Sequence, residues 1–325
     1  MKTIRWGIAG PGNIANKFAK AVLNADGAVL AAVASRSPER GRKFADTYGI
    51  KTVYSSYEEL AASDLVDAVY VSTPHPFHKS CAEIFLNAGK HVLCEKPLCI
   101  NATQAKELQD CAQRNGVFLM EAMWTRFLPA IQEAQAVVAR GEIGKILGLE
   151  ADFCYGYIGD DRKIYKNEMA GGALLDVGVY AQHFASAFLG DNPQSITAVA
   201  RVQDGTDRHT QVIMHYESGA IANLSSATDV QKPSTGFVYG TDGYIEFPSF
   251  YNAQEFILHT GNTVKQVQLP SLGDGFEEEI LEVCQCIRDG RTESQVLPLS
   301  KTVKMLEQMD EVRRQIGVSY PFDGE

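Results

Sequence analysis

The sequence lacks the features that mark membrane, secreted and zinc-binding proteins. No apolar run approaches the roughly 20 residues that a membrane-spanning helix needs, and the first ten residues lack the long apolar stretch of a signal peptide. The seven cysteines are scattered and include no C-x-x-C pair, which indicates neither a zinc site nor a disulfide framework. We therefore expect a cytoplasmic protein with reduced thiols and no metal.

Basic residues are also in the minority. The chain has 30 Lys and Arg against 40 Asp and Glu, which gives a formal net charge of −10. Such an acidic field disfavours nucleic acids and membrane surfaces as partners, although it leaves room for a local basic pocket. We expect the partner to be a small-molecule substrate.

The 325 residues, 45% of them hydrophobic, are enough for two domains with substantial cores. Strands alternate with helices over roughly the first 120 residues, which predicts an α/β Rossmann domain with a doubly wound parallel sheet. The pattern changes after Met120. We place the first domain at residues 1–121 and an α+β domain for substrate and dimerisation at residues 122–325, and a C-terminal helix could pack back on the first domain.

A glycine-rich turn follows the first predicted strand, Ile4 to Ala9, and opens a helix. Its pattern is G-x-G-x-x-A in the strand–turn–helix context that the dinucleotide fingerprint requires. Gly10 would make the tight turn, Gly12 would let the backbone approach a pyrophosphate, and Ala15 would allow close packing of helix on strand. The amino terminus of the helix would favour the phosphate charge.

The second predicted strand, Val29 to Ala34, ends without the acidic residue that usually holds the ribose of NAD. Ser35, Arg36 and Arg40 stand there instead, and guanidinium groups suit a 2′-phosphate. We therefore prefer NADP as the cofactor, with NAD possible. The alternative is that both arginines are solvated surface charge.

Two further strands end in loops at the edge where open α/β sheets bind ligands. Thr73-Pro74 follows one strand, and Glu95-Lys96-Pro97 follows another, because proline cannot continue a ladder. His75 and His78 form an H-x-x-H pair, but the prolines beside them break any aligning helix, so a loop near the nicotinamide is preferred over a metal site. The residues expected at the cofactor are Gly10, Gly12, Asn13, Ile14, Ser35, Arg36, Arg40, Thr73, Pro74, His78, Glu95 and Lys96.

The second half contains several strands joined by turns of hairpin type, which predicts a large, open, mainly antiparallel sheet. Only one face of such a sheet needs helices, so we expect a homodimer through the other face, possibly within a higher oligomer. A helix is predicted from Asp176 to Leu189. Asp176 and Tyr180 share one of its faces, but a tyrosine in such a helix is more often packing than catalytic.

Three motifs together resemble the glucose–fructose oxidoreductase / inositol dehydrogenase / MocA (Gfo/Idh/MocA) family. They are the G-x-G-x-x-A turn, Glu95-Lys96-Pro97, and Asp176-x-Gly178-x-Tyr180 after a double glycine. The likeness spans the whole chain and is greatest to the dimeric dihydrodiol dehydrogenase and NADP-dependent xylose dehydrogenase branch. It implies an NAD(P)-dependent oxidoreductase that acts on the CH–OH group of a sugar, polyol or trans-dihydrodiol.

The resemblance also implies roles for residues. Lys96 would contact cofactor and substrate, and Tyr180 would be the acid–base group at the position where inositol-type members carry histidine. The Lys96 ammonium would lower the Tyr180 pKa, and Asp176 would hold a substrate hydroxyl. His183 does not match the motif and is interpreted as structural. The residues expected to line the substrate pocket are Trp124, Arg126, Phe153 and Tyr155.

The residues alone leave two other classes of protein open. The chain could be a non-catalytic NADP-binding sensor or scaffold, which would have no reason to keep both Lys96 and Tyr180. A methyltransferase that binds S-adenosylmethionine through the same glycine turn is disfavoured by the arginines after the second strand. The substrate itself is not determined by the motifs, and the loop from Tyr155 to Met169 is expected to select it.

Overall fold

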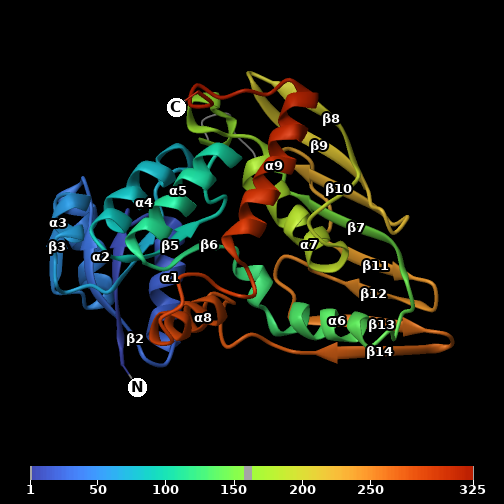
Figure 1. Cartoon of the computed structure of the whole chain (residues 1–325), viewed down its shortest axis with the longest axis horizontal. Coiled ribbons are helices and arrows are strands. Elements are labelled where there is room, and N and C mark those ends of the chain that lie inside the picture. Colours follow the sequence, from blue (N-terminus) through green and yellow to red (C-terminus); the bar gives the residue numbers. More distant parts are fainter. Residues whose placement is uncertain (1, 157–162, 325) are drawn as a thin grey trace. The chain divides into compact units, whose positions relative to one another are not determined.

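The computed structural model describes residues 2–156 and 163–324, and Figure 1 traces the chain. The chain forms two compact units. The first comprises residues 1–99, 103–124 and 272–303, and the second comprises residues 100–102, 125–271 and 304–325. No helix in the described ranges is long and apolar enough to cross a membrane.

The first unit is built on a six-stranded parallel sheet in the order β3-β2-β1-β4-β5-β6, which is the strand order of a Rossmann fold. The doubly wound sheet that the strand–helix alternation predicts is therefore confirmed. Its strands are β1 (Ile4–Ala9), β2 (Ala28–Ala34), β3 (Thr52–Tyr54), β4 (Ala68–Val71), β5 (His91–Glu95) and β6 (Leu119–Ala122). Its helices include α1 (Asn13–Asn24), α2 (Pro38–Tyr48), α3 (Tyr57–Ala61), α4 (His78–Asn87) and α5 (Ala102–Asn115), of which Ala102 falls in the second unit.

Aromatic stacking joins helix α1 to this sheet. The Phe18 ring lies 3.8 Å from the Tyr70 ring in a stacked arrangement and meets Trp6 edge to face. All three side chains are fully buried. Because α1 is packed this closely, its amino terminus and the glycine turn before it are held at the ends of β1 and β4.

One segment that the sequence assigns to the second domain clusters with the first unit. Helix α8 (Glu277–Arg288) is anchored to the start of the chain, since the Arg288 guanidinium donates to the backbone carbonyls of Lys2 and Gly27, each at 2.9 Å. The Leu119 N–H of β6 donates to the Thr292 carbonyl at 3.1 Å. These contacts link residues far apart in the sequence, so no local sequence pattern predicts them.

The second unit is an eight-stranded sheet in the order β14-β13-β12-β11-β7-β10-β9-β8, in which β7 and β10 run parallel and the other neighbours antiparallel. The predicted mainly antiparallel sheet is thus confirmed. Its strands are β7 (Ile146–Cys154), β8 (Ser195–Gln203), β9 (Thr206–His215), β10 (Ile221–Ala227), β11 (Gly236–Gly240), β12 (Gly243–Phe247), β13 (Glu255–Thr260) and β14 (Thr263–Gln268).

Helices α6 (Pro129–Ala139) and α7 (Val179–Leu189) lie over one face of this sheet (Figure 1). The opposite face carries exposed apolar side chains, and Val199 is 66%, Ile213 50% and Ile221 49% exposed. Helix α9 (Leu299–Ile316) ends in the second unit. The helix predicted from Asp176 begins two residues earlier, as a π-helical turn over Leu174–Gly178 that leads into α7. Such turns occur often at functional sites.

Candidate active site

The glycine turn has the geometry that a pyrophosphate needs. Gly10 has φ +90°, a conformation that favours glycine, and a Cβ there would lie in van der Waals contact with the Ser72 carbonyl oxygen at 3.4 Å. The Ser72 hydroxyl donates to the Gly10 carbonyl at 2.8 Å. Gly12 is the N-cap of α1 and supplies no side-chain hydrogen bond, which leaves the first N–H groups of the helix available to an anion.

The loop after β4 carries a buried polar group that has no hydrogen-bond partner among the described residues. The Thr73 hydroxyl is buried, and it meets no hydrogen-bond partner within the ranges that the structure describes. Its methyl carbon would lie 3.6 Å from a Cβ at Gly10, so the hydroxyl stands beside the glycine turn. Buried hydroxyls are normally satisfied, and a dinucleotide over this strand end fits the unpaired group.

His78 is fully enclosed rather than open to a cofactor. Its Nδ1 lies 2.8 Å from the Pro97 carbonyl oxygen, and its Nε2 lies 2.7 Å from the Thr73 carbonyl oxygen. Burial lowers the pKa of His78, and the two carbonyl contacts oppose that shift. The imidazolium makes both contacts at once, whereas a neutral ring can donate to only one carbonyl. His78 therefore links two strand-end loops, and its contact with a cofactor stays a prediction.

The three residues proposed to select NADP differ in their surroundings. Ser35 is buried, and its hydroxyl oxygen accepts the Ser37 N–H at 3.2 Å. Arg36 and Arg40 are exposed at the start of α2, and neither forms an ion pair within the described residues. Both guanidinium groups are therefore available to a phosphate, while Ser35 has a structural contact of its own.

Glu95 and Lys96 are held at the end of β5 by a buried acidic cluster. The Tyr70 hydroxyl donates to Glu95 Oε1, and the Lys96 N–H donates to Glu95 Oε2 at 3.1 Å. Burial raises the pKa of Glu95, and burial together with Glu95 raises that of Tyr70 well above its ordinary value. Glu279 of α8 is fully buried beside them, and burial and the Glu95 charge raise its pKa well above the ordinary range.

The Lys96 side chain is half-buried, and the Lys96–Pro97 peptide bond is cis. The loop that follows is fixed by the buried Glu121, which accepts the Leu98 N–H and the Thr302 hydroxyl, each at 3.0 Å. The sequence indicated the position of Lys96 at a strand end. Tyr70, Glu121 and Glu279 were not predicted, because a tyrosine in a strand and glutamates in helices or strands carry no local signal of burial.

In the second unit, Tyr180 stands in an aromatic cluster. Its ring meets Phe153 edge to face with the ring centroids 5.1 Å apart, and it lies 6.3 Å from the Tyr251 ring. Phe153 stacks on Tyr251 at 4.3 Å and contacts Tyr155 at 4.8 Å. The structure thus brings together three predicted residues. Tyr251 was missed, although it ends an aromatic-rich connection from Phe247.

Asp176 lies one helical turn before Tyr180, and both side chains are partly accessible. The Asp176 N–H donates to the Gly172 carbonyl at 3.3 Å, so the double-glycine turn begins the helical segment that carries both groups. Of the loop from Tyr155 to Met169 that was predicted to select the substrate, residues 157–162 lie outside the described residues.

Two other predicted pocket residues are buried. Arg126 is 4% exposed, and one guanidinium nitrogen donates to the His183 carbonyl at 2.9 Å, which ties it to α7. Burial lowers its pKa to about 10. Trp124, in the first unit, is 7% exposed and stacks on Phe276 with the centroids 5.3 Å apart. Contacts within its own unit thus bury most of the surface of each of these two side chains.

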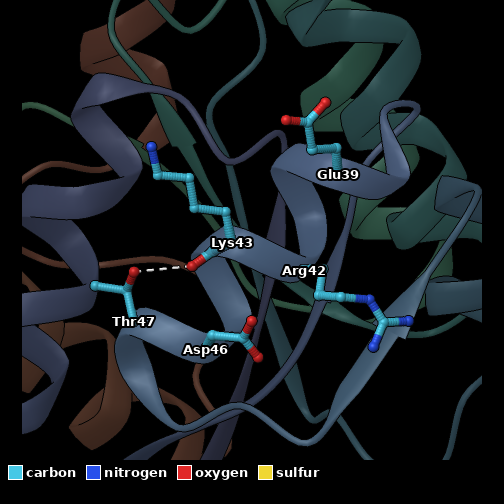
Figure 2. Close-up of a pocket in the computed structure, with 5 residues that line it drawn as sticks. All are labelled: Glu39, Arg42, Lys43, Asp46 and Thr47. Atoms are coloured by element: carbon cyan, nitrogen blue, oxygen red, sulfur yellow. Dashed lines mark hydrogen bonds between the residues drawn. The ribbon is translucent and has the colours of Figure 1, made fainter.

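A hollow on the surface of α2 is not a candidate active site. It is lined by Glu39, Arg42, Lys43, Asp46 and Thr47. Figure 2 shows these side chains spread along the outer surface of the helix, and the Thr47 hydroxyl donates to the Lys43 carbonyl at 2.8 Å. Charges of both signs on an exposed helix face are typical of solvated surface. Among the described residues, no group of three His, Cys, Asp or Glu could hold a metal ion.

The fold and the glycine turn define an NAD(P)-dependent oxidoreductase with a Rossmann domain and a second, open-sheet domain. The chain belongs to the Gfo/Idh/MocA oxidoreductase family, as its motifs indicate. The family model for an oxidoreductase with an NAD-binding Rossmann fold matches residues 4–123, and that of the GFO/IDH/MocA C-terminal domain matches residues 131–246.

Relatives extend over the whole chain. Trans-1,2-dihydrobenzene-1,2-diol dehydrogenase of Mus musculus is 35% identical over 98% of this chain and 99% of its own length, and the Homo sapiens enzyme of that name has the same values. A 3-ketoreductase from Actinomadura kijaniata, solved with NADP and TDP-benzene, has a TM-score of 0.89 and 26% identity over 98% of this chain and 99% of that one. An aldose-aldose oxidoreductase from Caulobacter crescentus, 24% identical with a TM-score of 0.89, covers 97% of each chain and shares the fold.

Proposed function

We propose that this protein uses NADP to transfer a hydride between the nicotinamide and the carbinol carbon of a sugar, polyol or trans-dihydrodiol. The observation that carries the proposal is the partly accessible Tyr180 with Asp176 one turn away and the rings of Phe153, Tyr155 and Tyr251 around it. Aromatic faces suit both the apolar side of a sugar ring and the ring of a dihydrodiol. Relatives named dihydrodiol dehydrogenases and an NADP-bound ketoreductase support the same chemistry.

The preference for NADP over NAD rests on Arg36 and Arg40. Arg36 is exposed just after β2 and Arg40 in the first turn of α2, near the strand end where the ribose of a bound dinucleotide would carry the 2′-phosphate. Their planar guanidinium groups pair with phosphate through two parallel hydrogen bonds. When bound, the nicotinamide supplies the hydride acceptor or donor.

The protein's own part is to hold the substrate and move one proton. Tyr180 takes the proton of the substrate hydroxyl in oxidation and returns it in reduction. A free tyrosine has a pKa of about 10, so a neighbouring cation is needed to favour the phenolate near neutral pH. We assign that role to Lys96, which the Glu95 carboxylate fixes through the backbone N–H. The pairing of Lys96 with Tyr180 rests on the sequence motifs. Asp176 accepts a second substrate hydroxyl.

The test is a screen of NADP⁺ and NAD⁺ reduction over aldoses, polyols and trans-dihydrodiols with the wild-type protein. Lys96→Ala and Tyr180→Phe should each lower kcat by about 10²–10⁴-fold, the usual contribution of an acid–base group, while NADPH still binds Tyr180→Phe normally. Tyr216→Phe is the matched control. It removes a buried hydroxyl that contacts the Met214 sulfur at 3.6 Å, and it should leave turnover unchanged.

The screen also decides between an enzyme and a non-catalytic NADP sensor or scaffold. A wild-type protein that binds NADPH tightly and turns over no member of the three substrate classes would favour the sensor. Near-full turnover in Lys96→Ala or Tyr180→Phe would exclude the mechanism, and equal affinities for NADPH and NADH would exclude the role of the two arginines.

We further propose that the protein is a homodimer through the uncovered face of the eight-stranded sheet. Stacked rings cross this face, with Phe237 and Tyr239 5.6 Å apart and Tyr244 and His259 4.1 Å apart. Apolar side chains at Val199, Ile213 and Ile221 extend it over β8, β9 and β10. An exposed apolar face of this breadth is typical of an association surface.

A further inference from the structure

Residues near the C-terminus form hydrogen bonds to the turn that precedes the helical segment with Asp176 and Tyr180. The Tyr320 hydroxyl donates to the Gly171 carbonyl at 2.9 Å, and Tyr320 is buried. Just before the turn, the Asn167 amide donates to the carbonyls of Ser319 and Gly205, each at 2.8 Å. Residues 319 and 320 therefore fix a segment that lies about 150 positions earlier in the sequence.

A buried acid holds the same turn from the sheet. Asp207, 1% exposed at the start of β9, accepts the Leu174 N–H at 2.8 Å and the Thr210 hydroxyl at 2.6 Å. Leu174 is the first residue of the π-helical turn, so a carboxyl oxygen meets an N–H group at the beginning of the helical segment. The hydrogen bond fixes where that segment starts.

This contact explains the double glycine. Gly172 has φ +133°, and a Cβ there would stand 2.0 Å from Asp207 Oδ1. A Cβ at Gly171 would stand 2.4 Å from the Ile164 carbonyl oxygen. Only glycine at both positions lets the chain pass between the carboxyl group and residue 164, which is the reason for the motif in front of Asp176.

The C-terminal segment is itself firmly attached. The buried Arg313 of α9 binds Asp323 and Asp310 at 2.8 Å, and its guanidinium carbon lies 4.8 Å from the centre of the Tyr320 ring. Asp323 also accepts the Tyr320 N–H at 2.8 Å. Tyr320 therefore presents its hydroxyl from a fixed support rather than from a loose tail.

We propose that Asp207 and Tyr320 are positioning residues that fix the Gly171–Leu174 turn and, through it, place Asp176 and Tyr180 for reaction. The link is short, since Asp176 follows Leu174 by two residues in the chain, its N–H donates to the Gly172 carbonyl, and Tyr180 follows one turn later. The inference rests on the proposed function of Tyr180. A displacement of about 1 Å in a reacting group can lower turnover a hundredfold.

The test compares Tyr320→Phe, Asp207→Ala and Asp207→Asn with the control Tyr216→Phe. Tyr320→Phe keeps the ring under Arg313 and removes only the hydroxyl. Asp207→Asn keeps an oxygen that can accept the Leu174 N–H, whereas Asp207→Ala removes it. Amide hydrogen exchange over residues 163–176, NADPH affinity, and kcat and KM for the oxidisable substrate are measured for each protein.

We expect faster exchange over residues 163–176 in Tyr320→Phe and Asp207→Ala. The kcat/KM should fall about tenfold in Tyr320→Phe and about a hundredfold in Asp207→Ala, while the NADPH affinity of both stays within twofold of the wild type. Asp207→Asn should recover most of the loss, which a merely destabilising role would not predict. Unchanged exchange in Tyr320→Phe, or faster exchange with unchanged kinetics, overturns the proposal. A wild type without turnover contradicts the proposed function instead, and the exchange data still decide whether the turn is held.

Discussion

At the scale of single residues, the buried Glu279, close to Glu95, should make the stability of the protein depend on pH. Glu279 is fully buried, and neither carboxyl oxygen has a hydrogen-bond partner within the described residues. Glu95, Tyr70 and Glu278 are the titratable groups around it, and burial followed by the Glu95 charge raises its pKa well above the ordinary value. The folded protein therefore favours the neutral carboxylic acid at this position.

Glu279→Gln should consequently make the protein more stable at neutral and alkaline pH. The unfolded chain ionises Glu279 near its ordinary pKa, while the folded chain retains the proton. The stability due to the neutral acid is thus complete below about pH 4.5 and lost as the pH rises toward the folded pKa. The variant has no such loss. Between about pH 4.5 and the folded pKa, its free energy of unfolding should therefore gain about 1.4 kcal/mol per pH unit relative to the wild type. Denaturation midpoints from pH 5 to 8 measure it.

Glu39→Gln is the control, because that side chain is exposed in the first turn of α2, away from the buried acidic cluster. A Glu279→Gln variant whose stability difference stays constant from pH 5 to 8 would show that Glu279 is ionised in the folded protein.

Individual residues also show what a sequence can and cannot predict. The places of Gly10 and Gly12 in a turn and of Lys96 at a strand end could be predicted, because such features have a local pattern. Their roles toward a cofactor stay predictions. Asp207 and Tyr320 have none, since their roles depend on contacts between segments far apart in the chain. The contact of Arg126 with the His183 carbonyl could not be predicted for the same reason, and the place of Arg126 in the substrate pocket stays a prediction.

At the scale of elements, the two strand-end loops of the Rossmann domain are joined through one side chain. His78 begins α4 and contacts both the loop after β4, at the Thr73 carbonyl, and the loop after β5, at the Pro97 carbonyl. Both loops carry residues that we expect at the cofactor. The His78 contacts therefore fix the position of the two loops relative to each other without the help of a bound cofactor.

His78→Phe should therefore weaken NADPH binding and lower stability together. Phenylalanine keeps an aromatic ring but can donate to neither carbonyl, and a buried carbonyl left unsatisfied costs about 1–3 kcal/mol. Fluorescence titration with NADPH should show at least tenfold weaker binding, and the denaturation midpoint should fall. His75→Phe changes a half-buried neighbour whose ring lies 5.7 Å from His78, and it should have a smaller effect on both measures. Normal NADPH affinity in His78→Phe would contradict the link.

The order and type of most elements could be predicted, because amphipathic periods and turn residues are local. The predicted helix from Asp176 to Leu189 is an example, and only its π-helical start was missed. That start depends on the Asp207 carboxyl group and on Gly178, where a Cβ would lie 3.0 Å from the Ser226 hydroxyl. The grouping of α8 with the first unit likewise depends on long-range contacts.

At the scale of the whole molecule, the open sheet leaves an apolar face to be covered. The pairing register places Ile213 opposite Thr197 and Asn223, and Asn223 opposite Glu150, so these side chains share one face. The same face continues through Phe237 and Tyr239. The Tyr239 hydroxyl donates to Glu150 at 3.3 Å, and its ring stacks on that of Phe237.

Ile213→Glu should break the proposed homodimer. Light scattering should give the wild type a mass twice that of one chain at micromolar concentration, and the variant a mass near one chain. An uncompensated charge buried in an interface costs about 3–5 kcal/mol, which weakens association by at least a hundredfold. Leu23→Glu is the control, since this 64% exposed side chain lies on helix α1 of the first unit, and the variant should remain dimeric. A wild type of single-chain mass, or an Ile213→Glu variant that stays dimeric, would exclude this face as the interface.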